Sequence, residues 1–313
     1  MSVSTDRDVS TPPAGVAAPP ASKMRVFGRR LASTLVLWGL LAAAIVFKVA
    51  WPFFLLVAVL ALGALWEYLK MDREGHPVHR WFIMTVAAGY YAAQFIVCGS
   101  VPYLNAPSLD TLASIDVLAG TLAITGSFVP VLFRPLEGRR TLWQVFYPAF
   151  GFFYVAVLFS FVLRILFGSW NAEHPMAGMF YALFLVSATK FTDSGAYAIG
   201  SLIGRHKMIP HISPGKTWEG LGGAFLGATV GGMAVVCSTG SMLSLLGKWD
   251  AFFLCLLLGA ICVVGDLAES IIKRCLEVKD SGRTLPGIGG ALDLIDSLLY
   301  TTPVLYLYLR HVG

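Results

Sequence analysis

Residues 251–270 read AFFLCLLLGAICVVGDLAES, an apolar run that ends with two acidic residues, Asp266 and Glu269. A helix needs about 20 apolar residues to cross the hydrocarbon core of a bilayer, and this stretch has that length. A charge inside such a helix costs about 2.5–3.5 kcal/mol on insertion scales. The stretch therefore predicts a transmembrane helix whose charged end has a specific purpose.

Eight more stretches of the chain have the same apolar character. Together with 250–270, the predicted spans are 31–47, 50–68, 81–99, 114–133, 142–167, 177–203, 219–239 and 290–309. The fold class that follows is all-α, a polytopic integral membrane protein with about nine transmembrane helices. For the first two spans, a single bent re-entrant hairpin is the alternative.

The composition of the whole chain agrees with this fold class. Of the 313 residues, 57% are hydrophobic and 13% are charged, whereas an average soluble domain is about 25% charged. The mean hydropathy is +0.72. These values exclude an ordinary soluble enzyme, a disordered chain and a disulfide-rich secreted module. The net charge of +5 does not indicate nucleic-acid binding, because the basic residues form short clusters between apolar runs.

The chain divides into three predicted regions. Residues 1–22 lack the apolar residues needed for a core and are expected to form a disordered tail. Residues 23–175 hold the N-terminal transmembrane helices, and residues 176–313 hold a C-terminal transmembrane catalytic core. Basic clusters precede the first span and follow every second span, which predicts a cytoplasmic N-terminus.

Three features of the apolar segments concern packing. The small residues Gly223, Gly227 and Gly231 are four apart, which favours close contact between helices. The five cysteines, none in a CxxC pair, are interpreted as buried thiols without a disulfide framework or a zinc site. Arg164 lies near the outer end of its span and is expected to snorkel toward the membrane surface.

Acidic residues lie inside the C-terminal spans, at the end that faces the cytoplasm in this orientation. They are Asp193, Asp266, Glu269, Asp293 and Asp296. Asp293 and Asp296 are three apart and share one helix face, where they repel unless a cation lies between them. Carboxylate oxygens are hard ligands that suit Mg²⁺ or Ca²⁺. Capping of a helix N-terminus is the alternative for the pair, but it does not explain Asp266.

A second unusual segment is HISPGKTWEG at residues 211–220. It resembles the end of a Walker A motif, but that motif requires a glycine at position 210, where this chain has Pro210. Ser213, Gly215 and Lys216, followed by the positive end of a helix, still predict a cradle for a phosphate group. A membrane-surface loop with a snorkelling lysine is the alternative.

Residues 270–297, SIIKRCLEVKDSGRTLPGIGGALDLIDS, resemble the signature of the phosphatidate cytidylyltransferase (CDP-diacylglycerol synthase) family. Residues 193–220 and Asp266 are similar to the family's upstream region. The signature residues present are Ser270, Lys273, Arg274, Lys279, Asp280, Pro286, Gly287, Gly289, Gly290, Asp293 and Asp296. Two positions depart from the signature: Ile288 stands where the family usually has histidine, and Leu294 stands where it usually has arginine.

The resemblance implies a nucleotidyltransferase that makes CDP-diacylglycerol and pyrophosphate from CTP and phosphatidate. It implies Mg²⁺ as cofactor, alone or with a second cation, held by Asp266, Asp280, Asp293 and Asp296. Catalytic roles would fall to Lys216, Lys273, Arg274, Lys279 and Asp280. Substrate binding would fall to Ser213, Gly215, Ser270, Gly287, Gly289, Gly290 and Asp193. A homodimer in a bacterial inner membrane, with its active site on the cytoplasmic face, is expected.

Two other functions compete with this interpretation. A CTP-dependent lipid kinase, similar to dolichol kinase, would release CDP instead of pyrophosphate. A cation-coupled transporter also carries charged residues inside the membrane. The acids here lie near one membrane face and no internal repeat is found, which argues against the transporter.

Overall fold

The computed structural model describes residues 51–99, 109–171, 173–174, 176–282, 284 and 289–312. The predicted tail 1–22 and the predicted span 31–47 lie outside these residues. Helices occupy the positions of the other eight predicted spans. The long helices are α2 (Trp51–Met71), α3 (Pro77–Gly99), α4 (Leu109–Phe128), α5 (Arg139–Gly151), α6 (Leu158–Phe167), α7 (Ala177–Ile203), α8 (Trp218–Thr239), α9 (Lys248–Cys275) and α10 (Ala291–Val312).

Six helical segments of the described chain are long and apolar enough to cross a membrane. One of them combines α5 and α6, which are joined by the π-helical segment η2 (Phe152–Val157). Helices α7 and α10, with 27 and 22 residues, also have the length of a span but carry charged side chains. The all-α membrane architecture is thus confirmed, while the count of about nine spans stays a prediction.

The remaining regular elements are short. The 3₁₀ segments η1 (Val129–Val131) and η3 (Gly240–Leu243) follow α4 and α8. The connection between the predicted spans 177–203 and 219–239 contains an antiparallel pair, β1 (Lys207–Ile209) and β2 (Ser213–Thr217), which joins α7 to α8. Thr217 ends β2 and begins α8, because its hydroxyl accepts a hydrogen bond from the Gly220 amide at 3.1 Å.

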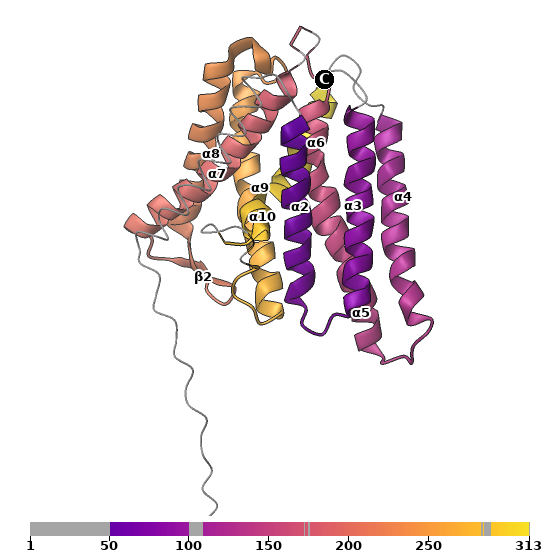
Figure 1. Cartoon of the computed structure of the whole chain (residues 1–313). Helices are drawn as coiled ribbons and strands as arrows, with labels where there is room; N and C mark the ends of the chain where they lie inside the picture. The colour runs from indigo at the N-terminus through magenta and orange to yellow at the C-terminus, as the bar shows by residue number, and fades with distance from the viewer. Residues whose placement is uncertain are drawn as a thin grey trace, which may run out of the picture.

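Helix α10 is the central element of the fold. It packs against α2, α6, α7 and α9, and its residues Leu292 and Leu299 are fully buried. Figure 1 shows α9 and α10 between the tilted α7–α8 pair on one side and α2, α3 and α4 on the other. The hairpin strand β2 lies at the opposite end of the helices from the C-terminus. Residues near the start of α10 therefore face the hairpin.

The α7–α8 pair packs backbone against backbone. A Cβ added at Gly223 or Gly227 would overlap the carbonyl oxygen of Gly195 or Phe191 on α7, and one at Gly231 would lie 2.7 Å from the Phe191 Cβ. The predicted packing role of this glycine stripe is confirmed. It fixes the spacing of the two helices that lead into and out of the hairpin.

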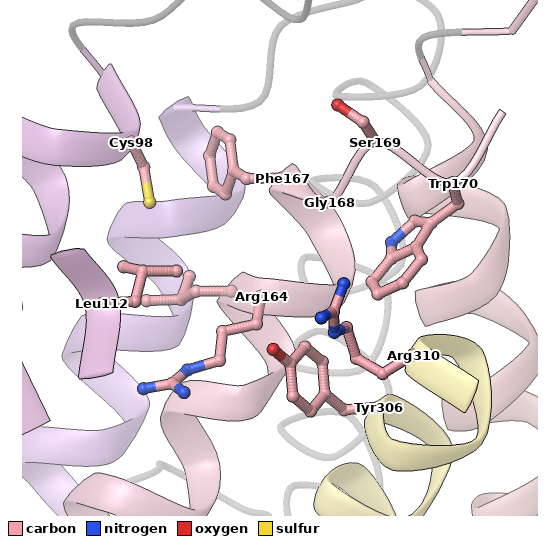
Figure 2. A pocket seen from close by; sticks show the side chains of 10 residues that line it. Cys98, Leu112, Arg164, Phe167, Gly168, Ser169, Trp170, Tyr306 and Arg310 are labelled. Atoms are coloured by element: carbon pink, nitrogen blue, oxygen red, sulfur yellow. The ribbon is translucent and has the colours of Figure 1, made fainter. Parts of the chain in front are cut away.

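Arg164 lies at the end of the helices away from the hairpin. There, side chains of α3, α4, α6 and α10 line a cavity of about 170 Å³, where Figure 2 shows the Arg164 guanidinium turned away from that of Arg310. Arg164 donates to Asp116 of α4 and lies 4.6 Å from the Phe161 ring centroid. The expected snorkelling is wrong, because a carboxylate inside the helix bundle neutralises the guanidinium.

The cysteines divide into two groups. Cys98, Cys255 and Cys262 are buried, as expected, whereas Cys237 and Cys275 are exposed. The prediction of five buried thiols is therefore wrong for two of them. Both lie near helix ends, at the last turns of α8 and α9, where the helices leave their packed neighbours.

Candidate active site

A cavity of about 610 Å³ lies between α7, the hairpin, and α8, α9 and α10. Residues as far apart in the sequence as Thr192 and Asp296 line it together. Charged and hydroxyl side chains on its wall are Thr192, Asp193, Tyr197, Ser201, Lys207, Ser213, Lys216, Thr217, Asp266, Asp293 and Asp296. The predicted acidic residues and the predicted phosphate cradle therefore line one cavity.

Three carboxylates form a cluster at this cavity. Asp266 and Glu269 from α9 and Asp296 from α10 each offer an oxygen within 4.8 Å of the others. Glu269 and Asp296 are only 1% and 7% exposed. Glu269 was not among the predicted ligands, although it follows Asp266 by three residues, the same spacing that drew attention to Asp293 and Asp296.

The donor set of this cluster suits a hard divalent cation. All of its ligand atoms are carboxylate oxygens. Within the described residues, the Glu269 Oε1 atom is buried without a hydrogen-bond partner. A buried carboxylate oxygen without a partner is costly, and a bound cation would satisfy it. The cluster therefore fits a metal ion such as Mg²⁺.

Two lysines contact the acids of the cavity. Lys216 on β2 is 2.9 Å from Asp266 Oδ2 and donates to the Val263 carbonyl at 3.2 Å. Lys273 is 2.7 Å from Glu269 Oε2 and 3.0 Å from Asp293 Oδ1. Both ammonium groups thus stand beside the cluster, within reach of an anion that binds there.

Asp293 has a different environment from Asp296. Besides the contact with Lys273, it accepts a hydrogen bond from the Gly290 amide at 3.2 Å. Asp293 thus caps the start of its own helix, as the alternative interpretation of the pair expected. It also lines the cavity, so capping and a role at the site coexist.

The hairpin and α7 form the opposite wall. Ser213 and Gly215 of β2 line the cavity, and a Cβ added at Gly215 would meet no atom within 4 Å. The packing of the protein therefore does not require glycine here, and the backbone is open to a ligand. Asp193 on α7 is exposed to the cavity and accepts from the Cys262 thiol at 3.4 Å.

Other predicted residues lie outside the cavity wall. Arg274 is exposed, and its Nε donates to the Ile212 carbonyl in the hairpin turn at 3.4 Å. Ser270 is half-buried on α9, while Lys279 and Asp280 are exposed; in the described part of the chain these three line no part of the cavity. The structure does not bring Asp280 to the carboxylate cluster.

The predicted glycines fall at the junction before α10. Gly287 and Ile288 lie outside the described residues. Gly289 has a φ of 124°, a backbone conformation that favours glycine. A Cβ at Gly290 would overlap the Ser281 hydroxyl. Gly289 thus allows the positive φ, and Gly290 allows the backbone to approach Ser281 closely.

The second departure from the signature, Leu294, packs on the hydrophobic core. Its carbonyl accepts a hydrogen bond from the Lys190 ammonium of α7 at 2.7 Å. A cation from a different helix is thereby held next to the position of the missing arginine. The sequence offered no signal for this contact, because Lys190 and Leu294 are 104 positions apart.

The cavity carries more negative than positive side chains. Four carboxylates and two ammonium groups line it. A polyphosphate would be repelled by this wall unless cations bound between its oxygens and the carboxylates. The arrangement suits metal-assisted chemistry on a phosphate compound at one end of a membrane bundle.

Comparison with known proteins agrees with this geometry. The sequence profile described as "Cytidylyltransferase family" matches residues 28–312. The chain is 40% identical over 162 residues to a phosphatidate cytidylyltransferase of Brucella suis, covering 52% of this chain and 56% of that protein. It is 29% identical over 282 residues to a phosphatidate cytidylyltransferase of Haemophilus influenzae, covering 88% and 96%.

A further relative has no assigned activity. The "Uncharacterized protein YnbB" of Escherichia coli is 40% identical over 134 residues, covering 43% of this chain and 44% of that protein. The matches at 40% identity thus span about half the length of these relatives. Activity and substrates are therefore inferred below from the site together with the family.

Proposed function

This chain belongs to the cytidylyltransferase family, and we propose that it transfers the cytidylyl group of CTP to phosphatidate, which gives CDP-diacylglycerol and pyrophosphate. The observation that carries the proposal is the meeting of β2, the end of α9 and the start of α10 at one cavity with a carboxylate cluster. The names of the relatives support the choice of substrates.

Asp266, Glu269 and Asp296 are the residues that would hold Mg²⁺. A bound ion would neutralise phosphate charge and make the α-phosphorus of CTP more electrophilic. Asp293 would contribute through its contact with Lys273, and Asp193 would contact the substrate or a second cation from the α7 wall. Asp280 stays a predicted ligand whose side chain lies outside the cavity.

In the proposed reaction, an oxygen of the phosphatidate phosphate attacks the α-phosphorus of CTP. The new phosphorus–oxygen bond forms as the bond to the α–β bridging oxygen breaks, and pyrophosphate leaves with that electron pair. A phosphate monoester has a second pKa of about 6 and is largely a dianion near neutral pH. The attacking group therefore needs no general base, and a chain without the family histidine at Ile288 retains the essential chemistry.

Basic side chains and an open backbone would handle the developing charge. Lys216 and Lys273 stand beside the cluster, where they would stabilise the pyrophosphate leaving group. Lys207 lines the same wall and would add a third positive charge. Ser213 and the backbone at Gly215 would hydrogen-bond a phosphate oxygen.

The membrane location follows from the same proposal. Basic clusters at the hairpin end of the bundle favour the cytoplasmic side for the cavity, where CTP is available. The acyl chains of phosphatidate would stay in the bilayer while its phosphate enters the cavity. The bacterial relatives favour an inner membrane, and a homodimer is the proposed assembly.

The test is turnover of purified protein in detergent with phosphatidate, labelled CTP and Mg²⁺, followed by analysis of lipid products and of released phosphates. The expected result is a CDP-lipid and pyrophosphate in equal amounts, with both lost on addition of EDTA and restored by excess Mg²⁺. Release of CDP with a newly phosphorylated lipid would instead establish the kinase reaction. Turnover that EDTA leaves unchanged would contradict the metal site.

A further inference from the structure

Glu67 is a buried acid in an apolar helix, and the proposed reaction does not use it. It lies near the end of α2 and is 3% exposed. Within the described residues, no lysine, arginine or histidine lies within ion-pair distance of its carboxylate. Burial of an unpaired carboxylate in a membrane helix is costly, so its hydrogen bonds need to be strong.

Both oxygens of Glu67 accept hydrogen bonds from the segment that joins α9 to α10. Oε1 accepts from the Thr284 amide at 3.1 Å and from the Thr284 hydroxyl. Oε2 accepts from the Leu292 amide at 3.0 Å and from the Ser281 hydroxyl at 3.5 Å. These partners are more than 200 positions away in the sequence, and together they bracket the junction.

Two glycines of the junction make room for this carboxylate. A Cβ added at Gly282 would lie 2.6 Å from the Glu67 Cγ, and one at Gly290 would lie 2.7 Å from its Oε2. Real Cβ atoms do not approach other atoms this closely. The absence of a Cβ at Gly282 and Gly290 therefore leaves the space that the Glu67 side chain occupies.

The contact with Leu292 connects Glu67 to the acid cluster. The Leu292 amide belongs to the first turn of α10, where amides have no partner inside the helix. The next residue, Asp293, binds Lys273, which in turn binds Glu269 of the cluster. One turn further along α10 lies Asp296. The position of the first turn thus sets the position of two acids at the cavity.

We propose that Glu67 is a positioning residue that holds Ser281, Thr284 and the first turn of α10 at Leu292, and that it thereby positions the carboxylate cluster. The proposal rests on the proposed function. Each Glu67 oxygen faces only donors, so the site requires a group that accepts at both ends. A glutamine has the same shape, but its NH₂ group would take the place of one Glu67 oxygen. At that position it would face N–H or O–H donors and could accept no hydrogen bond from them.

The experiment compares Glu67→Gln with Asp116→Asn, which removes a half-buried acid at the far end of the bundle. For Glu67→Gln, we expect kcat to fall about 10–100-fold, the range for loss of outer partners of metal ligands, and the half-saturating Mg²⁺ concentration to rise. Amide exchange at Thr284 and Leu292 should accelerate at least about tenfold. Asp116→Asn should lower the melting temperature and leave kcat, the Mg²⁺ dependence and these amides unchanged.

A second variant covers the case in which Glu67→Gln does not fold. Thr284→Val removes one donor from an exposed residue and should shift the Mg²⁺ dependence and the exchange in the same direction, by a smaller factor. Unchanged exchange at Leu292, or faster exchange with normal kcat and Mg²⁺ dependence, would overturn the proposal. Exchange does not depend on turnover, so an inactive wild-type protein would overturn the proposed function and leave this contact to be judged separately.

Discussion

Three carboxylates at the hairpin end of a membrane bundle are difficult to keep ionised. Glu269 and Asp296 are almost fully buried, and the oxygens of the cluster lie within 4.8 Å of each other. Desolvation and mutual repulsion both disfavour the charged forms. The two lysines offset part of the repulsion, and a bound cation would offset the rest. The cluster is therefore expected to bind a cation.

Replacement of Asp296 by asparagine tests whether the carboxylate cluster binds a cation. Asp296→Asn keeps the size of the side chain and removes one negative charge from the cluster, so Mg²⁺ should bind more weakly and the transition state should lose electrostatic stabilisation. We expect kcat/KM to fall by about 10²-fold or more. The measurement is CDP-lipid formation over a range of Mg²⁺ concentrations.

Asp250→Asn is the matched control, because Asp250 is an exposed acid at the start of α9, at the other end of the same bundle. It should leave the Mg²⁺ dependence unchanged. An Asp296→Asn variant with normal turnover would remove this residue from the metal site.

At this scale, spacing identified most of the site. The i, i+3 pattern of Asp293 and Asp296 predicted two acids on one helix face, and both line the cavity. Asp266 and Glu269 on α9 have the same spacing. What spacing could not decide is which acids meet. Asp293 turns to Lys273 and its own helix start, and Glu269, which was not a predicted ligand, joins the cluster instead.

At the scale of elements, the β1–β2 hairpin forms one wall of the cavity. Ser213, Gly215 and Lys216 led to the prediction of a phosphate cradle at residues 211–220, and all three line the cavity. The strand pairing was not predicted, because strands of three and five residues give no alternating pattern long enough to detect. The Thr217 cap then fixes where α8 begins, so the cradle and the helix start are held together.

The glycine stripe of α8 leads to a prediction about stability. Gly227→Ala would place a Cβ against the Phe191 carbonyl, and a backbone atom in a packed helix pair cannot move aside. We expect a loss of about 1–3 kcal/mol or more, seen as a lower melting temperature in detergent. Activity should fall with it, since α7 carries Asp193.

The matched control is Gly222→Ala on the same helix, where an added Cβ would meet nothing within 4 Å. Alanine is the better helix former by about 1 kcal/mol, so this variant should be as stable as the wild type or more so. Equal destabilisation by both changes would show that the stripe is not a packing seam.

For the whole molecule, hydropathy located the helices because the bilayer requires long apolar segments. It could not indicate how they associate, because lipid-facing and buried residues are both apolar. The Glu67 contacts show the limit clearly: α2 and the junction before α10 are joined by hydrogen bonds over more than 200 positions. The predicted boundary between N-terminal helices and a C-terminal core divides the sequence, but these hydrogen bonds connect the two parts.

The orientation of the molecule in the membrane can be tested with its own thiols. Cys275 lies at the cavity end of α9 and Cys237 at the other end of α8, and both are exposed. We expect a membrane-impermeant maleimide to label Cys237 in intact spheroplasts and Cys275 in inverted vesicles. The variants Cys237→Ser and Cys275→Ser assign the signals. The reverse pattern would place the cavity on the side away from cytoplasmic CTP and contradict the proposed orientation.

The contact between α7 and α8 also limits how a lipid reaches the cavity. Along this seam the glycines bring backbone against backbone, so no side chain can rotate to open a gap. Hydrocarbon chains cannot pass between these two helices. If the head group of a lipid lies in the cavity, its acyl chains must therefore reach the bilayer between other helices of the bundle. The α7–α8 contact closes this side of the site to acyl chains.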